Sequence, residues 1–184
     1  TSTIIAGSIG STMRSMEPYG LATRELIRDV FREQIEALLE GGVDCLQFET
    51  FGNIDELDVA LSAARECTDL PVIAMMTFAE DGVTVGGTGV RDVVARLTSH
   101  RIDVMGANCS IGPSKLLPIV KSMRRELRDR DIERLLVAMP NAGWPTTSGG
   151  RVVYPSTPEY FADFARDAVD SGIRLIGGCC GTTP

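Results

Sequence analysis

Short apolar segments rich in Val, Ile and Leu alternate along the chain with longer segments of helical periodicity. The short segments are almost continuously apolar, as in strands buried on both faces of a parallel sheet. The longer segments repeat their apolar residues at helical spacing, and the first of them stops at a glycine pair. The predicted strands cover residues 3–7, 45–50, 72–78, 104–109, 135–140 and 174–178; the predicted helices cover 22–40, 54–67 and 89–100 and two further segments that begin near Pro113 and Thr157.

This alternation predicts an α/β domain built from βαβ units. A doubly wound nucleotide-binding sheet is disfavoured, because no helix opens directly behind GSIGS (7–11) and no acidic residue follows the next strand at a suitable spacing. A (β/α)8 TIM barrel is favoured, because such barrels carry their sites at the carboxyl ends of the strands. Polar residues and thiols stand at those ends here, namely Ser8, Glu49, Thr77, Asn108, Cys109, Asn141, Cys179 and Cys180.

Six predicted strands are fewer than the eight of a closed barrel. We therefore expect an incomplete barrel within residues 1–184, lacking two N-terminal βα units and the last helix. No change of composition marks a second domain, so a single partial domain is expected. The strands at 3–7 and 174–178 then become free edges, which invite pairing with a further segment or with a second copy of the chain.

The composition and the charge argue against a nucleic-acid-binding, a membrane-spanning or a secreted protein. Hydrophobic residues make up 43% and charged residues 23%, as in an ordinary soluble globular protein. The net charge of −7 argues against nucleic acid as a partner, and no apolar run has the length of a membrane span. Residues 1–10 also lack the basic start and long apolar core of a signal peptide. We therefore expect a cytoplasmic protein whose five cysteines are reduced.

Three cysteines, Cys109, Cys179 and Cys180, lie at carboxyl ends of predicted strands. If two strands precede residue 1, the strands ending in Glu49, Cys109 and Cys179 are the fourth, sixth and eighth, and alternate strands point into one layer. Catalytic zinc typically has three protein ligands and an open position, so these thiols predict a Zn²⁺ site. Two alternatives are a pair of cysteines packed in the core and a strained vicinal disulfide at 179–180.

The remaining candidates for thiol or imidazole chemistry are weaker. Cys45 begins a strand at the end opposite the other thiols, and Cys67 ends a helix, so neither is expected to bind metal. His100 is the only histidine and falls in a helix tail, where a basic residue suits the helix dipole. The sequence therefore offers no His–Cys or Ser–His dyad.

Four motifs carry a resemblance across the whole chain: FETF (48–51), GANCS (106–110), PNAG (140–143) and GGCCGTTP (177–184). In this order they resemble the zinc-dependent homocysteine S-methyltransferase family, including the homocysteine module of cobalamin-dependent methionine synthase. The resemblance implies a TIM barrel whose third strand is AGSIG (6–10). It also implies homocysteine as substrate and a methyl donor, cobalamin or folate, carried by another domain or protein. The family's first motif, an Asp-Gly pair on the first strand, is absent from this sequence.

The resemblance implies roles for further residues. Glu49 would receive the substrate's ammonium group; the alternative is a structural salt bridge of a carboxylate in an apolar run. Asn141 would lie at the zinc, where it could fill the vacant position in the absence of substrate; the alternative is a turn cap.

Residue chemistry alone suggests three more contacts. Gly7 and Ser8 could offer a backbone N–H and a hydroxyl to the substrate carboxylate, or simply form a tight turn. Asn108 could orient Cys109 as a group behind the metal ligand, or make an ordinary loop hydrogen bond.

The leading hypothesis is a homocysteine S-methyltransferase module in which zinc activates the substrate thiol. A thiol redox or metal-binding protein that uses the vicinal cysteines is one alternative, but redox proteins more naturally use C-x-x-C. A non-catalytic barrel fragment is another. Besides the methyl-donor partner, oligomers are possible for a domain with open edges.

Overall fold

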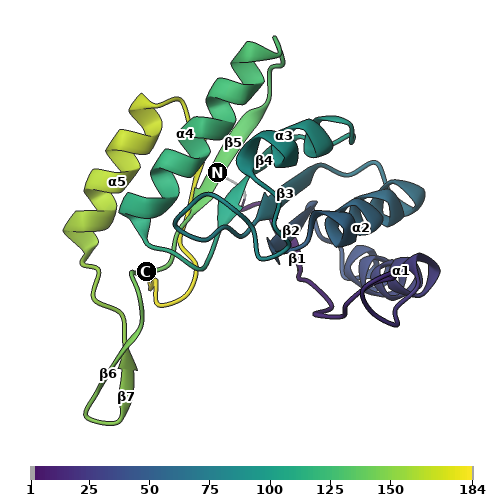
Figure 1. Cartoon of the computed structure of the whole chain (residues 1–184), viewed down its shortest axis with the longest axis horizontal. Helices are drawn as coiled ribbons and strands as arrows, with labels where there is room; N and C mark the ends of the chain where they lie inside the picture. Colours follow the sequence, from purple (N-terminus) through teal and green to yellow (C-terminus); the bar gives the residue numbers. More distant parts are fainter. Residues whose placement is uncertain (1–2, 184) are drawn as a thin grey trace.

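Six parallel strands form one curled sheet, a half-barrel, in the order β1-β2-β3-β4-β5-β8 (Figure 1). The structure is a computed structural model that describes residues 3–183. The strands are β1 (Ala6–Ile9), β2 (Cys45–Phe51), β3 (Val72–Met76), β4 (Val104–Asn108), β5 (Leu135–Met139) and β8 (Leu175–Ile176). The expected α/β class, the six parallel strands and the two free edges, β1 and β8, are confirmed, with small shifts in the bounds of the edge strands.

Five helices connect the strands. They are α1 (Arg24–Glu40), α2 (Ile54–Cys67), α3 (Val90–Thr98), α4 (Pro113–Asp129) and α5 (Pro158–Asp170). The first begins two residues later than predicted, because the side chain of Thr23 accepts a hydrogen bond from the backbone N–H of Leu26 and so caps the helix. The third ends at Thr98, so His100 lies beyond the helix rather than in its last turn.

A second, two-stranded sheet is an addition to the predicted fold. Strands β6 (Thr146–Ser148) and β7 (Arg151–Val153) pair antiparallel around Gly149 and Gly150, in a segment that the sequence pattern presents as a polar loop. Both glycines have positive φ, as a tight hairpin turn requires. The hairpin extends away from the half-barrel near the C-terminal end of the chain (Figure 1).

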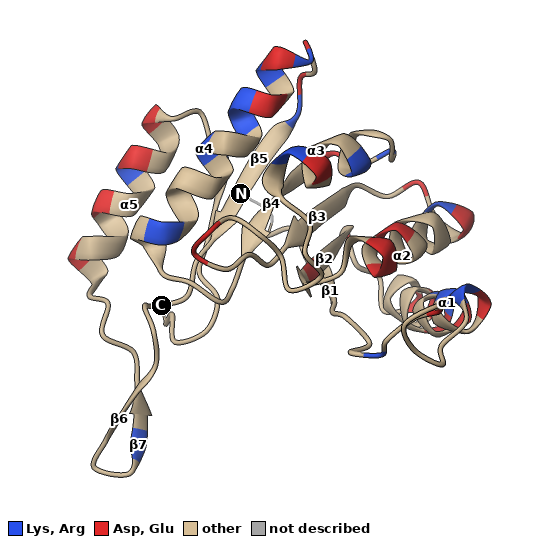
Figure 2. Ribbon diagram, in the orientation of Figure 1, with Lys and Arg blue, Asp and Glu red and all other residues tan. Residues whose placement is uncertain are grey.

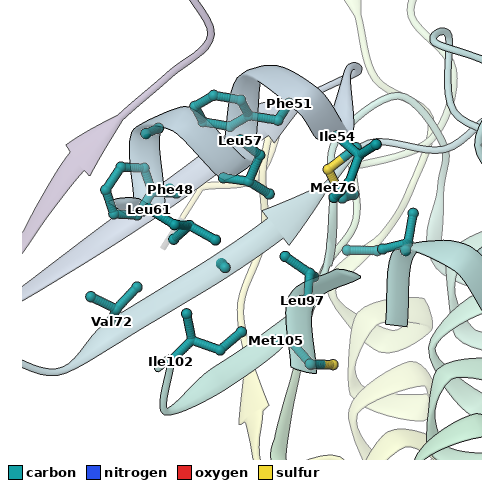
Figure 3. Packing of buried hydrophobic residues seen from close by; sticks show 14 of the residues in the cluster. Phe48, Phe51, Ile54, Leu57, Leu61, Val72, Met76, Leu97, Ile102 and Met105 are labelled. Carbon is teal, nitrogen blue, oxygen red and sulfur yellow. The ribbon is translucent and has the colours of Figure 1, made fainter. Parts of the chain in front are cut away.

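The two faces of the curled sheet carry different cores. The helices pack on the outer face, where the largest cluster includes side chains of α2 and of the strands beneath it (Figure 3). The inner face carries a small cluster made only of strand residues: Cys45, Ile73, Met75, Val104 and Val137, with Met139 and Leu175 packed against it. This division follows from the strand geometry, since successive side chains point to opposite faces.

Acidic and basic residues are interspersed along the helices (Figure 2). The net charge of the chain is −7. Among the described residues, no helix combines the length and apolar character needed to cross a bilayer.

Candidate metal centre

The register of the sheet brings several predicted residues onto its inner face. Ser8 pairs with Gln47, which pairs with Ile73, and this row continues across the sheet. Because side chains alternate along a strand, Glu49 and Asn108 share the inner face with this row, nearer the carboxyl ends. The polar residues expected at one end of the barrel therefore gather there.

The three thiols converge. The sulfur atoms of Cys109, Cys179 and Cys180 all lie within 4.8 Å of one another, and those of Cys109 and Cys180 are 3.8 Å apart. Three sulfurs bound to one tetrahedral zinc at about 2.3 Å would be about 3.8 Å apart. A disulfide would require about 2.05 Å, and all five cysteines are free thiols. The donor set and spacing therefore fit a zinc ion.

Main-chain hydrogen bonds hold the thiol-bearing loops. The backbone N–H of Cys179 donates to the carbonyl of Pro140 at 2.8 Å, and the carbonyl of Cys180 accepts from Ala142 at 2.9 Å. The side-chain Oδ1 of Asn141, itself buried, accepts from the backbone N–H of Cys180 at 3.2 Å. Asn141 thus fixes the loop that carries two of the thiols.

Cys109 is held by a hydrogen bond to strand β5 and by an unusual backbone conformation. Its N–H donates to the carbonyl of Met139 on β5, and its φ is 61°. Ser110 follows with a φ of 64°. Two successive non-glycine residues in the left-handed region are costly and typically persist only where the surrounding structure enforces them, often at functional sites.

The thiol cluster disfavours negative charge in the absence of a cation. Burial first, and then the neighbouring Cys109 and Cys180 thiols, raise the pKa of Cys179 to about 12. Thiolates this close together repel one another, so a compensating positive charge would favour their formation. A divalent cation supplies that charge, so metal binding at this site would release protons.

Asn108 connects the thiols to the second strand. It is fully buried; its Oδ1 accepts from the backbone N–H of Thr50 at 2.9 Å, and its Nδ2 donates to the hydroxyl of Thr50 at 2.9 Å. The same Nδ2 lies 3.5 Å from Glu49 Oε2 and 3.8 Å from the sulfur of Cys179. The side-chain hydrogen bonds of Asn108 thus run to Thr50, Glu49 and Cys179, not to Cys109.

Glu49 is half-buried and held by neutral donors. Its Oε1 accepts from the hydroxyl of Ser8 at 2.6 Å and from the side-chain amide of Gln47 at 3.2 Å. Among residues 3–183, no Lys, Arg or His pairs with this carboxylate, so the structural salt bridge is not observed. The pairing register of β2 with β3 shifts between Phe48 and Phe51, the stretch that contains Glu49.

Gly7 and Ser8 have separate environments. A Cβ at Gly7 would lie 3.1 Å from Leu38 and 3.2 Å from Val43, so this glycine allows α1 to pack closely on the outer face of β1. Only the backbone of Gly7 is available to a ligand, whereas the hydroxyl of Ser8 bonds to Glu49.

The residues expected to lie outside the site do so. Cys45 is buried in the inner cluster at the start of β2, and Cys67 is the last residue of α2. His100 Nε2 lies 2.9 Å from Asp58 Oδ1, in an ion-pair cluster between α2 and α3 that also includes Arg96.

Two residues near the thiols are missed by the sequence patterns. Thr50 bonds to Asn108, and the ring of Tyr154, at the end of the hairpin, fills the space beside Gly181, the residue after Cys180. The signal for Tyr154 is the Gly149–Gly150 pair, flanked by residues that can pair as strands, which marks a hairpin that returns the chain to the site.

Comparisons with known proteins agree with this architecture. The sequence pattern of the family described as homocysteine S-methyltransferase matches residues 1–184. The methionine synthase of Mycobacterium tuberculosis is 28% identical over 98% of the chain, and the S-methylmethionine–homocysteine S-methyltransferase of Mus musculus is 31% identical over 86%. The chain spans only 15% and 46% of the lengths of these two relatives.

Solved structures give the same result. The apo form of the homocysteine methyltransferase MmuM from Escherichia coli matches 98% of this chain with a TM-score of 0.71 and 27% identity, over 59% of its own length. The metallated form of that enzyme matches 89% of this chain with a TM-score of 0.70 and 26% identity, over 50% of its length. With a family match that covers every residue and a half-barrel that superposes on a family member, the chain belongs to the homocysteine S-methyltransferase family.

Proposed function

We propose that this chain is the homocysteine-binding part of a zinc-dependent homocysteine S-methyltransferase. Cys109, Cys179 and Cys180 would hold one Zn²⁺ ion and leave a fourth position for the substrate sulfur. The observation that carries the proposal is the convergence of these three sulfur atoms within 4.8 Å. The relatives that the chain matches are named as enzymes acting on homocysteine or producing methionine.

The bound zinc would supply the chemistry of thiol activation, because a coordinated thiol is deprotonated at neutral pH, whereas a free thiol has a pKa of roughly 8.5. The protein would contribute to this activation through the negative charge of its three thiolates and through the solvent exposure of the site. Three thiolates on a divalent cation give a net negative site, which keeps a further bound sulfur electron-rich. Cys180 is exposed, so the cluster is accessible to a substrate and to a methyl donor.

The amino-acid end of the substrate would bind across β1 and β2. Glu49 accepts hydrogen bonds from Ser8, Gln47 and Asn108 without a cationic partner among the described residues, which favours it as the acceptor for an ammonium group. Ser8, beside it, and the backbone of Gly7 would face the substrate carboxylate. Asn108 would keep this end in register with Cys179, and Asn141 would keep Cys180 in place.

The methyl donor, for which cobalamin or folate is the expected carrier, would approach on another domain or protein. No further domain boundary is assigned within residues 1–184, which we propose form one partial barrel.

The test combines metal content with turnover. The reduced protein is loaded with Zn²⁺, its metal content is measured, and methionine formation is followed with homocysteine and free methylcobalamin. We expect one Zn²⁺ per chain and methylation that depends on it, with Cys67→Ser as a control that retains both. Metal binding without methylation would support a metal-binding role alone, and a vicinal disulfide under mild oxidant without metal binding would support the redox alternative.

A further inference from the structure

Two carboxylates on α2 are buried, and their partners differ in charge. Asp58 is 8% exposed and pairs with Arg96 of α3 and with His100. Glu56 is only 3% exposed, yet no Lys, Arg or His among residues 3–183 lies within ion-pair distance of it. A buried carboxylate without a cation is costly unless hydrogen bonds satisfy it. Glu56 therefore depends on neutral donors.

The loop after β1 supplies those donors. Glu56 Oε1 accepts from the backbone N–H of Thr12 at 2.7 Å and from the Thr12 hydroxyl at 2.6 Å, and Oε2 accepts from the Ser11 hydroxyl at 2.6 Å. Hydrogen bonds to a charged acceptor are short and strong. The loop also folds around these side chains, since the N–H of Met13 donates to Ser11 Oγ at 3.0 Å and the N–H of Arg14 to Thr12 Oγ1 at 3.3 Å. One carboxylate thus orders this loop.

The position of Glu56 within its helix shows that this contact replaces a common local one. Asn53 is the N-cap of α2, and Glu56 is the third residue of the helix. In a capping box, a glutamate at this position reaches back to the backbone N–H of the cap residue. Here both carboxylate oxygens bond to the β1 loop instead, while the helix N-terminus still favours the negative charge. Glu56 therefore connects α2 to a segment more than 40 residues earlier in the chain.

The loop that Glu56 holds begins just beyond Ser8, on a strand with a free edge. Among the described strands, β1 pairs only with β2, through the four residues Ala6–Ile9. The Ser8 hydroxyl donates to Glu49 at 2.6 Å, and a Cβ at Gly10 would lie 3.9 Å from the carbonyl oxygen of Glu49. Short edge segments fray at low free-energy cost. By fastening the chain after Ser8, Glu56 opposes fraying at the end of β1 that lies at the site.

We propose that Glu56 is a positioning residue for the amino-acid end of the substrate: by anchoring the loop after β1 to α2, it keeps the hydroxyl of Ser8 against Glu49. This inference rests on the proposed function, in which Ser8 and Glu49 receive the carboxylate and ammonium groups of homocysteine. Glu56 acts through the loop, because its own oxygens are occupied by Ser11 and Thr12. Its loss weakens recognition of the amino-acid end and leaves sulfur binding at the thiol cluster unchanged.

The first experiment tests the anchor and needs neither metal nor substrate. Backbone hydrogen exchange is followed by mass spectrometry in the unmodified protein, in Glu56→Ala and in Asp58→Ala, the matched control that truncates the other buried carboxylate of α2. We expect the peptide 9–16 to exchange at least about tenfold faster in Glu56→Ala, the loss that one hydrogen bond to a charged group typically causes, and to stay protected in the control. Unchanged exchange of this peptide in Glu56→Ala overturns the anchor.

A second variant keeps this test decisive if Glu56→Ala does not fold. Ser11→Ala combined with Thr12→Val removes two of the three donors from half-buried positions of the loop and leaves α2 intact. We expect the same faster exchange of the peptide 9–16 in this double variant. Exchange equal to that of the unmodified protein overturns the anchor.

The second experiment tests the positioning role. Each zinc-loaded protein is titrated by calorimetry with homocysteine and with 1-propanethiol, which offers a sulfur but has neither an ammonium nor a carboxylate group. We expect Glu56→Ala and the Ser11→Ala/Thr12→Val variant to bind homocysteine about tenfold more weakly and propanethiol as before, because only the amino-acid end loses a contact. Asp58→Ala should bind both thiols like the unmodified protein.

The two thiols separate positioning from a general structural role. Equal weakening of both thiols in Glu56→Ala, or an unchanged affinity for homocysteine, overturns the positioning role while the proposed function stands. If the unmodified protein binds neither thiol, the proposed function and the positioning role fail together, and the exchange rates alone decide whether Glu56 anchors the loop.

Discussion

Replacing Cys180 by serine tests the metal centre with little disturbance of the fold. A hydroxyl stays protonated and is a harder, poorer zinc ligand than a thiolate, so metal affinity should fall at least about ten- to a hundredfold, the scale that even changes behind the ligands reach. That range corresponds to about 1.4–2.7 kcal/mol of binding free energy. The free energy of unfolding should change by only about 0.5 kcal/mol, because Cys180 is exposed. Its backbone bonds to Asn141 and Ala142 do not involve the sulfur.

The assay is a competition titration of Zn²⁺ against a chromophoric chelator, beside thermal melting followed by circular dichroism. Cys67→Ser serves as the control, since Cys67 lies at the end of α2, away from the cluster. Methyl transfer should fall with metal affinity, because the substrate thiol would then ionise unaided. Unchanged zinc affinity would show that Cys180 is not a ligand. Loss of folding in the absence of metal would show that the cluster is structural and would remove the catalytic interpretation.

Three further changes test the fold. Phe31→Ala, at a fully buried position of α1, should lower the unfolding free energy by about 3–5 kcal/mol in urea denaturation; a loss below 1 kcal/mol, as for a typical surface change, would contradict this packing. Gly106→Ala should destabilise by about 1–3 kcal/mol, because its Cβ would collide with a β5 carbonyl; an unchanged melting temperature would refute the close approach. Burial raises the pKa of Asp58, but hydrogen bonds from His100 and Arg96 together lower it by more, so the net shift is downward. Stabilisation by Asp58 is therefore present above the ordinary value of about 3.9 and lost as pH falls through the lower folded value. Urea denaturation at a series of acidic pH values should show that Asp58→Asn removes the loss of unfolding free energy that occurs as the pH falls. An unaltered pH profile would contradict the stabilising contacts of Asp58 with His100 and Arg96.

The order of the strands was predictable because buried parallel strands are marked by near-continuous apolar runs and because βαβ connections leave few topologies. The convergence of Cys109, Cys179 and Cys180 was predictable for a related reason: in a barrel the carboxyl ends of all strands meet on one face. Helix α1 was predicted two residues early, since apolar periodicity alone does not reveal that Thr23 is a cap.

The contacts of individual side chains were not predictable in the same way. The irregularity in β2 around Glu49 leaves no apolar pattern, and the partners of Asn108 depend on the local geometry at the end of β2 rather than on strand order alone. Tyr154 was missed because two three-residue strands are too short to show alternation. Chain topology therefore determined which segments meet, while hydrogen bonds between loops determined which atoms face each other.

The position of the buried Asn108 determines how far local unfolding of an edge strand would spread through the site. The thiols depend on the loops after β4, β5 and β8, whereas Ser8 and Glu49 depend on β1 and β2, and Asn108 bridges the two groups. Fraying of the free edge at β1 would release Ser8 from Glu49 without touching any hydrogen bond of the Cys179–Cys180 loop. Local unfolding at β1 would therefore disturb the Ser8–Glu49 end of the site and leave the thiol loops in place, with the amide side chain of Asn108 as the link between the two groups.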